Sequence, residues 1–209
     1  MRLALALASC YLLGSVPFGM IMGMLRKVDI RQYGSGNIGA SNVLRILGTG
    51  PGVLVLVLDT LKGFAAVMIC KALGLDAHWV VAGALCGILG HTFSVFLRFR
   101  GGKGVATSLG VIFGLNWLIA LIAFALWVIL VGITRYISLA SIIATISVPS
   151  MMFFWKSQHV PVAFQALAVV AALAIVVKHT SNVKRLLSGT EAKIGERVDI
   201  TKKKEEQSL

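Results

Sequence analysis

Two glycine-rich segments carry residue types that bind phosphate, and the first of them begins at Gly34. It reads Gly-Ser-Gly-Asn-Ile-Gly, and a basic residue, Arg45, follows soon after. Glycine-rich backbone can turn several N–H groups toward one anion, and hydroxyl, amide and guanidinium groups add donors and charge. We therefore predict a phosphate site in this segment. Its predicted residues are Gly34, Ser35, Gly36, Asn37, Ser41, Asn42 and Arg45.

The same segment matches the GxGxxG pattern of dinucleotide-binding loops, with Asp59 about 20 residues further on. We reject this interpretation because Asp59 falls in an apolar stretch long enough to cross a membrane. In addition, no strand–helix–strand unit surrounds the glycines. A flexible loop without a ligand remains the alternative to a phosphate site.

The second glycine-rich segment, residues 98–107, places a lysine among glycines directly before an apolar stretch. A helix N-terminus has free N–H groups and the positive end of the helix dipole, and both attract phosphate. The GxxxxGK[ST] spacing of a P-loop is absent, so a different anion site is indicated. The alternative is a basic turn that only orients the chain in a membrane. The predicted phosphate-binding residues are Gly101, Gly102, Lys103, Gly104 and Thr107.

Polar residues inside apolar stretches are costly in a membrane and therefore indicate function. Asp59 and Lys62 are three residues apart, on one face of a predicted helix, where they can pair. His91 and Ser94 have the same spacing on the next predicted helix. A structural ion pair and a packing histidine are the alternatives. We expect Asp59, Lys62 and Ser94 to support a site and His91 to take part in its chemistry.

Further polar residues lie at the ends of the last two apolar stretches. Ser141 begins one of them, and His179, Asn182 and Arg185 follow the other at a spacing that puts them on one helix face. Serines that bond their own backbone and interfacial side chains that snorkel are the alternatives. If these stretches span a membrane, both glycine-rich segments, Ser141 and His179 reach the same side. That convergence predicts a site for two phosphates, reached from the bilayer.

The composition of the 209-residue chain is that of a membrane protein. Hydrophobic residues make up 57% of it and charged residues only 13%, against about 25% charged residues in globular proteins. The mean hydropathy is +0.89. These values exclude disorder, a coiled coil and a soluble domain, so we predict an all-α polytopic membrane protein. The net charge of +12 also suits a nucleic-acid binder, but most basic residues flank apolar stretches, and no nucleic-acid partner is predicted.

A helix that crosses the bilayer needs ~20 mainly apolar residues, and about seven transmembrane helices are predicted. The weakest candidate is 105–114, which covers only about 15 Å at 1.5 Å per residue. The basic residues on either side of 105–134 should face the same side of the membrane, so that region must cross twice or re-enter. We predict a hairpin at 114–117 between its halves. The predicted spans are 3–25, 52–73, 78–97, 105–114, 116–134, 137–155 and 160–178.

The positions of lysine and arginine predict the orientation. Sixteen of the 20 lie on one side of the predicted spans, three on the other, and Lys62 lies within a span. Cytoplasmic loops are enriched in Lys and Arg, so the N-terminus is predicted outside and the C-terminus in the cytoplasm. Trp79, Trp117 and Trp155 fall at the outer interface, as an aromatic belt would. The sixteen are Arg26, Lys27, Arg31, Arg45, Arg98, Arg100, Lys103, Arg135, Lys178, Lys184, Arg185, Lys193, Arg197, Lys202, Lys203 and Lys204, and the three are Arg2, Lys71 and Lys156.

The chain is predicted to form one integral membrane domain over 1–200, followed by a charged, flexible tail at 201–209. A lipoprotein-like cleavage box ends at Cys10, but the apolar stretch continues past it, so we expect a retained first span. Cys10, Cys70 and Cys86 have no CxxC spacing and are expected to be free thiols. No cluster of Asp, Glu or His has metal-ligand spacing, so no metal and no cofactor are predicted.

Three motifs together resemble the bacterial acyl-phosphate glycerol-3-phosphate acyltransferase family of PlsY type, and the likeness covers nearly the whole chain. They are Gly34-Ser-Gly-Asn-Ile-Gly-Ala-Ser-Asn42 with Arg45, Gly90-His-Thr-Phe-Ser-Val-Phe-Leu97 continued through Gly101-Gly-Lys-Gly-Val-Ala-Thr107, and His179-Thr-Ser-Asn-Val-Lys-Arg185 with Gly189, Glu191 and Lys193. The stretch Asp59-Thr-Leu-Lys62-Gly63 is also similar to the family. The one departure is Ser41, where the family has threonine, and the hydroxyl is kept.

The resemblance implies a reaction. Such enzymes transfer a fatty acyl group from acyl phosphate to the sn-1 hydroxyl of glycerol 3-phosphate, the first step of phospholipid synthesis. Lysophosphatidic acid and phosphate are released, and neither a thioester donor nor a metal is implied. The residues that the resemblance places in catalysis are Ser35, His91, Lys103 and His179. The base is one of the two histidines or a phosphate oxygen of the substrate. The residues expected around the phosphates include Asn37, Ser141, Asn182 and Arg185.

The expected partners are glycerol 3-phosphate, acyl phosphate, membrane lipid and an enzyme that supplies acyl phosphate. The expected location is the bacterial inner membrane, with the site facing the cytoplasm. A transporter of a phosphorylated metabolite is one rival, but it should carry polar residues through the full bilayer depth and often has an internal repeat. A lipid-binding scaffold is the other rival, and it has no use for the His and Ser positions. The His-x4-Asp motif of other glycerolipid acyltransferases is absent, because Phe96 stands five residues after His91.

Overall fold

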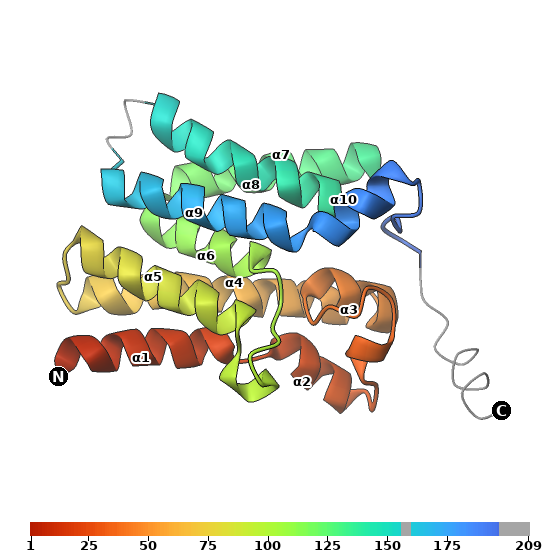
Figure 1. The fold of residues 1–209 in the computed structure, drawn as a ribbon, viewed down its shortest axis with the longest axis horizontal. Helices are drawn as coiled ribbons and strands as arrows, with labels where there is room; N and C mark the ends of the chain where they lie inside the picture. The colour runs from red at the N-terminus through yellow and green to blue at the C-terminus, as the bar shows by residue number, and fades with distance from the viewer. Residues whose placement is uncertain (156–159, 197–209) are drawn as a thin grey trace.

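The computed structural model describes residues 1–155 and 160–196, which form helices and loops without a strand. The long helices lie side by side along the long axis of the molecule (Figure 1). The predicted all-α fold is therefore confirmed, while the predicted tail at 201–209 lies outside the described residues. The elements are α1 (Arg2–Ser15), α2 (Phe18–Leu25), η1 (Ile30–Gln32), α3 (Ala40–Leu47), α4 (Thr49–Ala72), α5 (Ala77–Thr92), η2 (Val95–Leu97), α6 (Val105–Leu115), α7 (Trp117–Thr134), α8 (Ile137–Phe154), α9 (Val162–Lys178) and α10 (Thr180–Leu187).

Within the described residues, five helical segments are long and apolar enough to cross a membrane. They are Arg2–Leu25, Thr49–Ala72, Ala77–Leu97, Trp117–Thr134 and Ile137–Phe154. A sixth is reached only if α9 and α10, which meet at 54°, count as one bent span. Helix α6 has 11 residues, about 16 Å of helix against a hydrocarbon core of about 30 Å. The count of seven spans therefore stays a prediction, and α6 is the segment that is too short to cross alone.

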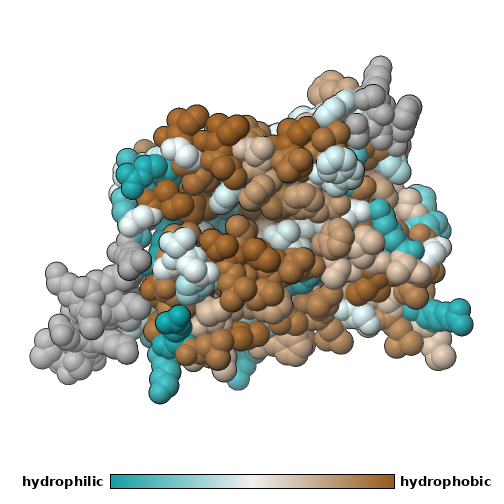
Figure 2. Space-filling model, turned by 180° about the vertical axis from the view of Figure 1, so that it is seen from behind, coloured by the Kyte–Doolittle hydropathy of each residue, from teal (hydrophilic) through white to brown (hydrophobic). Residues whose placement is uncertain are grey.

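The surface of the bundle fits a lipid environment. Figure 2 shows hydrophobic side chains over most of the flank and hydrophilic side chains mainly toward the two ends. Large apolar side chains on the outer faces of the long helices are exposed, among them Leu61, Trp117, Ile129 and Leu173. In water such a surface would drive association, whereas in a bilayer it meets lipid chains.

The first predicted span is broken in the structure. Helix α1 ends at Ser15, and α2 begins at Phe18. Pro17 lies between them and cannot donate a backbone hydrogen bond, so the helical hydrogen-bonding pattern is interrupted there. The carbonyl of Val16 instead accepts a hydrogen bond from the Lys62 ammonium at 2.9 Å. The sequence contained the signal for this break in Pro17, but the prediction of one continuous span did not use it.

Glycines let the helices approach each other closely. A Cβ atom added to Gly110 of α6 would lie 1.8 Å from the backbone oxygen of Thr60 of α4. One added to Gly87 of α5 would lie 2.9 Å from the Cβ of Ala66, and the Gly87 oxygen itself touches Gly14 of α1. The GxxxG spacing at residues 83–87 therefore serves packing within the bundle.

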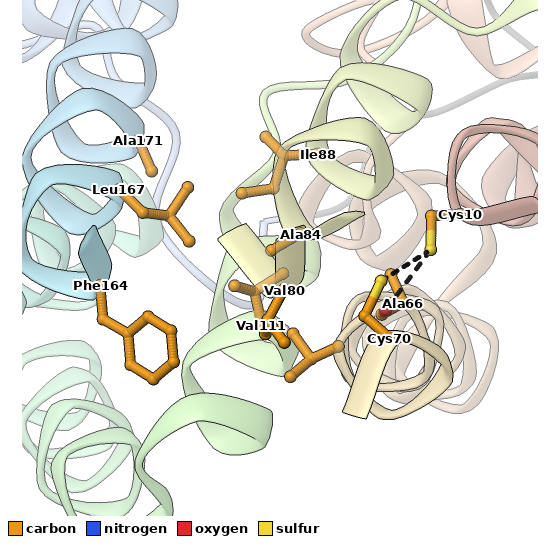
Figure 3. Close-up of a cluster of buried hydrophobic side chains, with 11 residues drawn as sticks. Cys10, Ala66, Cys70, Val80, Ala84, Ile88, Val111, Phe164, Leu167 and Ala171 are labelled. Atoms are coloured by element: carbon orange, nitrogen blue, oxygen red, sulfur yellow. Dashed lines mark hydrogen bonds between the residues drawn. The ribbon is translucent and has the colours of Figure 1, made fainter. Parts of the chain in front are cut away.

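Helices α1, α4, α5, α6 and α9 meet in an apolar core. Figure 3 shows Val80, Ile88 and Val111 between Phe164 and Leu167 on one side and the pair Cys10 and Cys70 on the other. The two sulfur atoms are 3.9 Å apart, and Cys10, Cys70 and Cys86 are all free thiols, as predicted. The core fixes the relative positions of the helices whose ends carry the polar residues.

The polar residues of interest gather toward one end of the bundle. Figure 1 places the N-terminus at the opposite end from α2, α3 and α10. We call the latter the α10 end. Residues 114–117 form the predicted hairpin: α6 ends at Leu115, and Asn116 caps α7 by accepting a hydrogen bond from the Ile119 amide at 3.0 Å. Which end faces the cytoplasm stays a prediction.

Candidate active site

Lys103 projects from the short loop between α5 and α6 into a cluster of polar side chains. Its Nζ donates a hydrogen bond to Oδ1 of Asn182 on α10. Burial, together with the nearby charges of Arg185 and Arg45, lowers the pKa of Lys103 to about 8, although the Glu191 carboxylate acts to raise it. The cation therefore lies in a largely dehydrated place, where an added anion would be held strongly.

Glu191 joins the basic side chains of this cluster. Its Oε1 accepts a hydrogen bond from Nδ2 of Asn182 at 2.8 Å, and its Oε2 accepts one from Nε of Arg185 at 2.7 Å. Arg45 Nη2 lies 3.6 Å from Oε1. Burial raises the pKa of Glu191, but the hydrogen bonds from Asn182 and Arg185 hold it below its ordinary value, so the group stays ionised. The predicted residues Lys103, Asn182, Arg185 and Arg45 are thus brought together around one carboxylate.

Sequence analysis did not assign Glu191 a role in the site. A signal was available: Glu191 is the one acidic residue between Asp76 and Glu196, and it follows a run of basic residues. A carboxylate isolated among cations in a membrane protein indicates an internal ion pair. Its place in the centre of the cluster depends on the turn after α10, where the amides of Thr190 and Glu191 both bond the carbonyl of Arg185.

Arg45 lies on α3 and is only 6% exposed. Its Nη2 donates a hydrogen bond to the carbonyl of Ala192 at 3.1 Å, while its Nε has no protein partner. Helix α3 carries its polar residues on one side and its apolar residues on the other, which turns Arg45 inward. One buried guanidinium N–H is therefore unpaired, while Arg45 itself is absent from the wall of the cavity described below.

The first glycine-rich segment is arranged differently from the prediction. Asn42 is buried, and its amide bonds the carbonyls of Ile30 and Tyr33 and the amide of Ser35. These contacts hold the loop in shape and leave Asn42 no free group for phosphate, so its predicted role is corrected to a structural one. Gly34 and Gly36 have φ values of 58° and 68°, which glycine adopts without strain.

Two side chains at the edge of that segment, Asn37 and Ser41, are better placed to contact a ligand. Asn37 accepts a hydrogen bond from the Gly39 amide at 2.9 Å, and both Asn37 and Ser41 line the cavity described below. Ser35 is exposed and is absent from the cavity wall. Its predicted catalytic contact is therefore not seen in this structure, although its loop borders the site.

The second glycine-rich segment also differs from the prediction of a free anion-binding backbone. The amide of Gly101 donates to the carbonyl of Thr92, and that of Gly102 to the carbonyl of His91, both at 3.0 Å. These donors are committed to the end of α5, so the predicted backbone contacts of Gly101 and Gly102 with phosphate are not supported. Gly104, with φ of 85°, starts α6 and lines the cavity.

Ser108, and not the predicted Thr107, borders the cavity. Thr107 is fully buried, is absent from the cavity wall, and lies against Gly63 of α4, so its predicted phosphate contact is not supported. Ser108, which the sequence analysis missed, lines the cavity one residue later. Neither hydroxyl has a hydrogen-bond partner in the protein. The direction in which α6 turns decides between them, and the sequence alone does not fix it.

The pair Asp59–Lys62 forms as predicted, with Lys62 Nζ 2.7 Å from Asp59 Oδ1. His91 Nδ1 lies 3.7 Å from the same oxygen. Ser94 does not share a helix with His91, because α5 ends at Thr92. Its hydroxyl instead donates to the carbonyl of Ser15 at 2.6 Å, which ties the end of α5 to the end of α1. Ser94 therefore supports the site from outside it.

Ser141 lines the cavity, whereas His179 is buried and absent from the cavity wall. Ser141 Oγ donates to the carbonyl of Ile137 at 2.7 Å and accepts from Trp127 Nε1 at 3.1 Å, and both residues line the cavity. The sequence analysis did not select Trp127, although an indole N–H in the middle of a membrane span needs a hydrogen-bond acceptor. His179 Nδ1 lies 2.8 Å from the carbonyl of Ile175. A carbonyl only accepts, so Nδ1 donates, and Nε2 of the neutral ring is left as an acceptor.

A cavity of about 360 Å³ runs from this cluster into the bundle. Its polar end is lined by Lys103, Ser41 and Ser141, Asp59 and His91 also border it, and the rest of its wall is mostly apolar. Small and branched side chains from α6, α7, α8 and α9 form that inner part, among them Val111, Ala123, Val148, Leu167 and Ala168. The arrangement joins a cationic mouth to an apolar interior. It suits a molecule with an anionic head and a hydrocarbon chain.

Comparison with known proteins agrees with this chemistry. A model of the family described as glycerol-3-phosphate acyltransferase matches residues 4–189. The chain belongs to this family. A glycerol-3-phosphate acyltransferase of Gloeobacter violaceus is 44% identical over 194 residues, which cover 90% of this chain and 93% of the relative. One of Mesorhizobium japonicum is 46% identical over 195 residues, covering 92% and 96%.

Solved structures resemble the acyltransferase as well. A crystal structure of PlsY (YgiH), an integral membrane glycerol 3-phosphate acyltransferase in its glycerol 3-phosphate form, has a TM-score of 0.86 and 42% identity. It covers 93% of this chain and 96% of the other. The lysophosphatidic acid form of PlsY has a TM-score of 0.81 at the same identity and covers 94% and 97%. The present chain is thus a PlsY-type acyltransferase of the membrane, as the motif resemblance had predicted.

Proposed function

We propose that this acyltransferase transfers a fatty acyl group from acyl phosphate to the sn-1 hydroxyl of glycerol 3-phosphate. The products are lysophosphatidic acid and inorganic phosphate. The observation that carries the proposal is the continuity of the basic cluster around Lys103 with the apolar cavity of about 360 Å³. A lipid donor with a phosphate head fits that shape, and the solved relative in its glycerol 3-phosphate form supports the acceptor.

The cations of the cluster have two tasks in this reaction. The two substrates are anions that repel each other, so Lys103, Arg45 and Arg185 offset that repulsion and hold the reacting groups close. The same charges stabilise the negative charge that develops on the departing phosphate. Acyl phosphate is a mixed anhydride, so its leaving group needs no further activation by a covalent intermediate.

The chemical step is a direct transfer. The sn-1 oxygen bonds to the acyl carbon, the bond between that carbon and the phosphate oxygen breaks, and inorganic phosphate takes the electron pair. The proton of the hydroxyl goes to a phosphate oxygen of the substrate or to His179, whose Nε2 is an acceptor when the ring is neutral. We favour the substrate phosphate, because it is already at the reacting atoms.

The donor chain occupies the inner cavity, and the acceptor comes from water at the α10 end. The positive-inside bias of the sequence supports a position of that end in the cytoplasm of a bacterial cell, with the protein in the inner membrane. Acyl phosphate arrives from an enzyme that makes it, and lysophosphatidic acid leaves into the same leaflet. No cofactor takes part in this scheme.

One assay tests the proposal. Purified protein in detergent is given labelled glycerol 3-phosphate and either acyl phosphate or the corresponding acyl-CoA, with and without EDTA. We expect lysophosphatidic acid from acyl phosphate alone, with EDTA having no effect. Equal turnover with acyl-CoA, or activity that EDTA removes and a divalent metal restores, contradicts the proposed donor chemistry. Binding without product in every arm would favour a transporter or a lipid-binding scaffold.

A further inference from the structure

Three charged or titratable side chains lie beside the cavity without joining the cluster around Lys103. Asp59, Lys62 and His91 are 2%, 3% and 5% exposed, so all three are removed from water. Lys62 Nζ is 2.7 Å and His91 Nδ1 is 3.7 Å from Asp59 Oδ1, which makes the carboxylate the centre of the group. Charged groups are kept in such a place only when they are paired and the pairing has a use.

Lys62 is fully occupied by the protein. Besides Asp59, its ammonium bonds the carbonyl of Val16, which also accepts the Phe18 amide at 3.2 Å, and it lies 5.5 Å from the centre of the Phe18 ring. Lys62 is also absent from the cavity wall, so its ammonium is not placed to contact a substrate phosphate. Lys62 therefore anchors Asp59 to the junction of α1 and α2, where the chain has no helical bonding of its own.

His91 links this anchor to the glycine loop. Its Nδ1 side faces Asp59, and its Nε2 side faces Gly102: a Cβ atom added to Gly102 would lie 2.2 Å from Nε2. The amide of Gly102 also bonds the carbonyl of His91 at 3.0 Å. The residue directly before Lys103 is thus held by both the ring and the backbone of His91. His91 borders the cavity, but because its two ring nitrogens face Asp59 and Gly102, the ring is poorly placed to take a proton from a substrate hydroxyl.

We propose that Asp59, Lys62 and His91 form a positioning network that sets the place of Lys103 by holding Gly102 against the His91 ring. His91 is then a positioning residue and not the base, and Gly102 is a glycine because the ring occupies the space of a side chain. The proposal rests on the proposed function in one respect, that Lys103 binds a substrate phosphate.

The test is a double-mutant cycle between positions 91 and 102. Gly102→Ala, His91→Asn and the double variant are assayed for the kcat and for the KM of both substrates. Gly102→Ala places a methyl group against the ring and displaces Lys103, so we expect the KM of at least one substrate to rise ~10-fold, as residues in contact can couple by that much. Asparagine keeps a donor toward Asp59 but ends short of Gly102. The double variant should therefore regain most of the loss, and His91→Asn alone should keep kcat within ~3-fold.

The controls use residues of the same types in open surroundings. Gly132 of α7 has nothing within 4 Å of an added Cβ, so Gly132→Ala should leave both kinetic constants unchanged. His78 is exposed near the start of α5, so His78→Asn is the control for His91→Asn and should also leave both kinetic constants unchanged. Gel filtration of each variant checks folding, and His91→Gln replaces His91→Asn in the cycle if the latter is not recovered.

Two results overturn the network. A general base typically contributes ~10²–10⁴-fold to the rate, so a loss of kcat of that size in His91→Asn at unchanged KM would place His91 in the chemistry. A double variant no better than Gly102→Ala would show that ring and loop are not coupled. Lys103→Ala is assayed alongside: if it has no effect while the cycle shows coupling, the proposed phosphate contact of Lys103 fails, and only the contact of the His91 ring with Gly102 stands.

Discussion

Lys103 brings a positive charge into a place where few water molecules reach it, and its pKa of about 8 reflects that. Arg45 approaches the same place from α3 with one N–H unpaired. Charge-assisted hydrogen bonds to phosphate contribute about 1.5–3 kcal/mol. Alanine at either residue should therefore lower kcat/KM at least ~10-fold, since 1.4 kcal/mol is tenfold. Steady-state kinetics on purified variants measures this.

Two companion variants sharpen that measurement. Lys103→Arg should rescue poorly, because a planar guanidinium does not fit the space in which the ammonium meets Asn182. Lys184→Ala removes an exposed cation on the same helix as Asn182 and should change little. Near-normal kinetics for both alanine variants, in protein that is folded and membrane-inserted, would mean that Arg45 and Lys103 only orient the chain.

The low pKa of Lys103 has a consequence for the pH profile. Below pH 7 nearly all molecules carry the charged lysine, and the charge is lost as the pH rises through about 8. The pH dependence of kcat/KM reports the free enzyme. We expect kcat/KM to fall on the alkaline side with an apparent pKa near that value. The fall should be absent in Lys103→Ala, whose remaining activity has no lysine to titrate; the same alkaline limb in that variant would assign it to another group.

Residue types and spacing were enough to select Lys103, Arg45 and Asn182, because cations and amides beside glycines near a membrane surface have few other uses. They were insufficient for Glu191 and Trp127. The partners of those two are set by how α10 turns back and how α7 packs on α8, and neither depends on local sequence. The same holds for Asn42, whose amide completes its own loop instead of facing a ligand.

At the scale of helices, the tight contact of α4 with α6 positions the loop that carries Lys103. A methyl group on Gly110 would meet the backbone of Thr60, which has no alternative rotamer, so the helices would have to separate. Overpacking of this kind costs about 1–3 kcal/mol. Gly110→Ala should therefore lower the thermal unfolding midpoint in detergent and impair activity.

Gly132→Ala is the matched control for that variant. It lies in α7 with nothing within 4 Å of an added Cβ, and alanine is the better helix former by about 0.5–1 kcal/mol. Its unfolding midpoint should stay the same or rise. If both glycine variants behave alike, close packing of α6 on α4 is not what limits stability.

The apolar stretches predicted the long helices well, since ~20 apolar residues in a row have few other structures. Their interruptions were harder to predict. The break at Val16–Pro17 and the end of α5 at Thr92 both fall inside apolar sequence. Each is stabilised by a distant group, Lys62 in one case and the Ser15 carbonyl in the other. Hydropathy depends only on the residue types along the chain, so it contains no information about contacts between residues that are distant in sequence.

For the whole molecule, the orientation in the membrane is the prediction that all others require. A reporter fused after residue 209 should be active in the cytoplasm, and a tag before Met1 should be accessible from outside. Both follow from sixteen basic residues on one side of the predicted spans against three on the other. The reverse result would turn the cluster around Lys103 away from cytosolic substrate and would refute the proposed function.

The cavity has a cationic mouth that leads to an apolar interior. This shape determines the unit of concentration on which the supply of each proposed substrate depends. Glycerol 3-phosphate reaches the mouth from solution, so its supply depends on moles per litre. The donor and the product reach the interior from the leaflet, so their supply depends on their mole fraction among lipids. Adding inert detergent at fixed donor should slow the reaction by surface dilution while leaving the half-saturating glycerol 3-phosphate concentration unchanged. Under the proposed function, the reaction rate therefore depends on membrane area as well as on metabolite level.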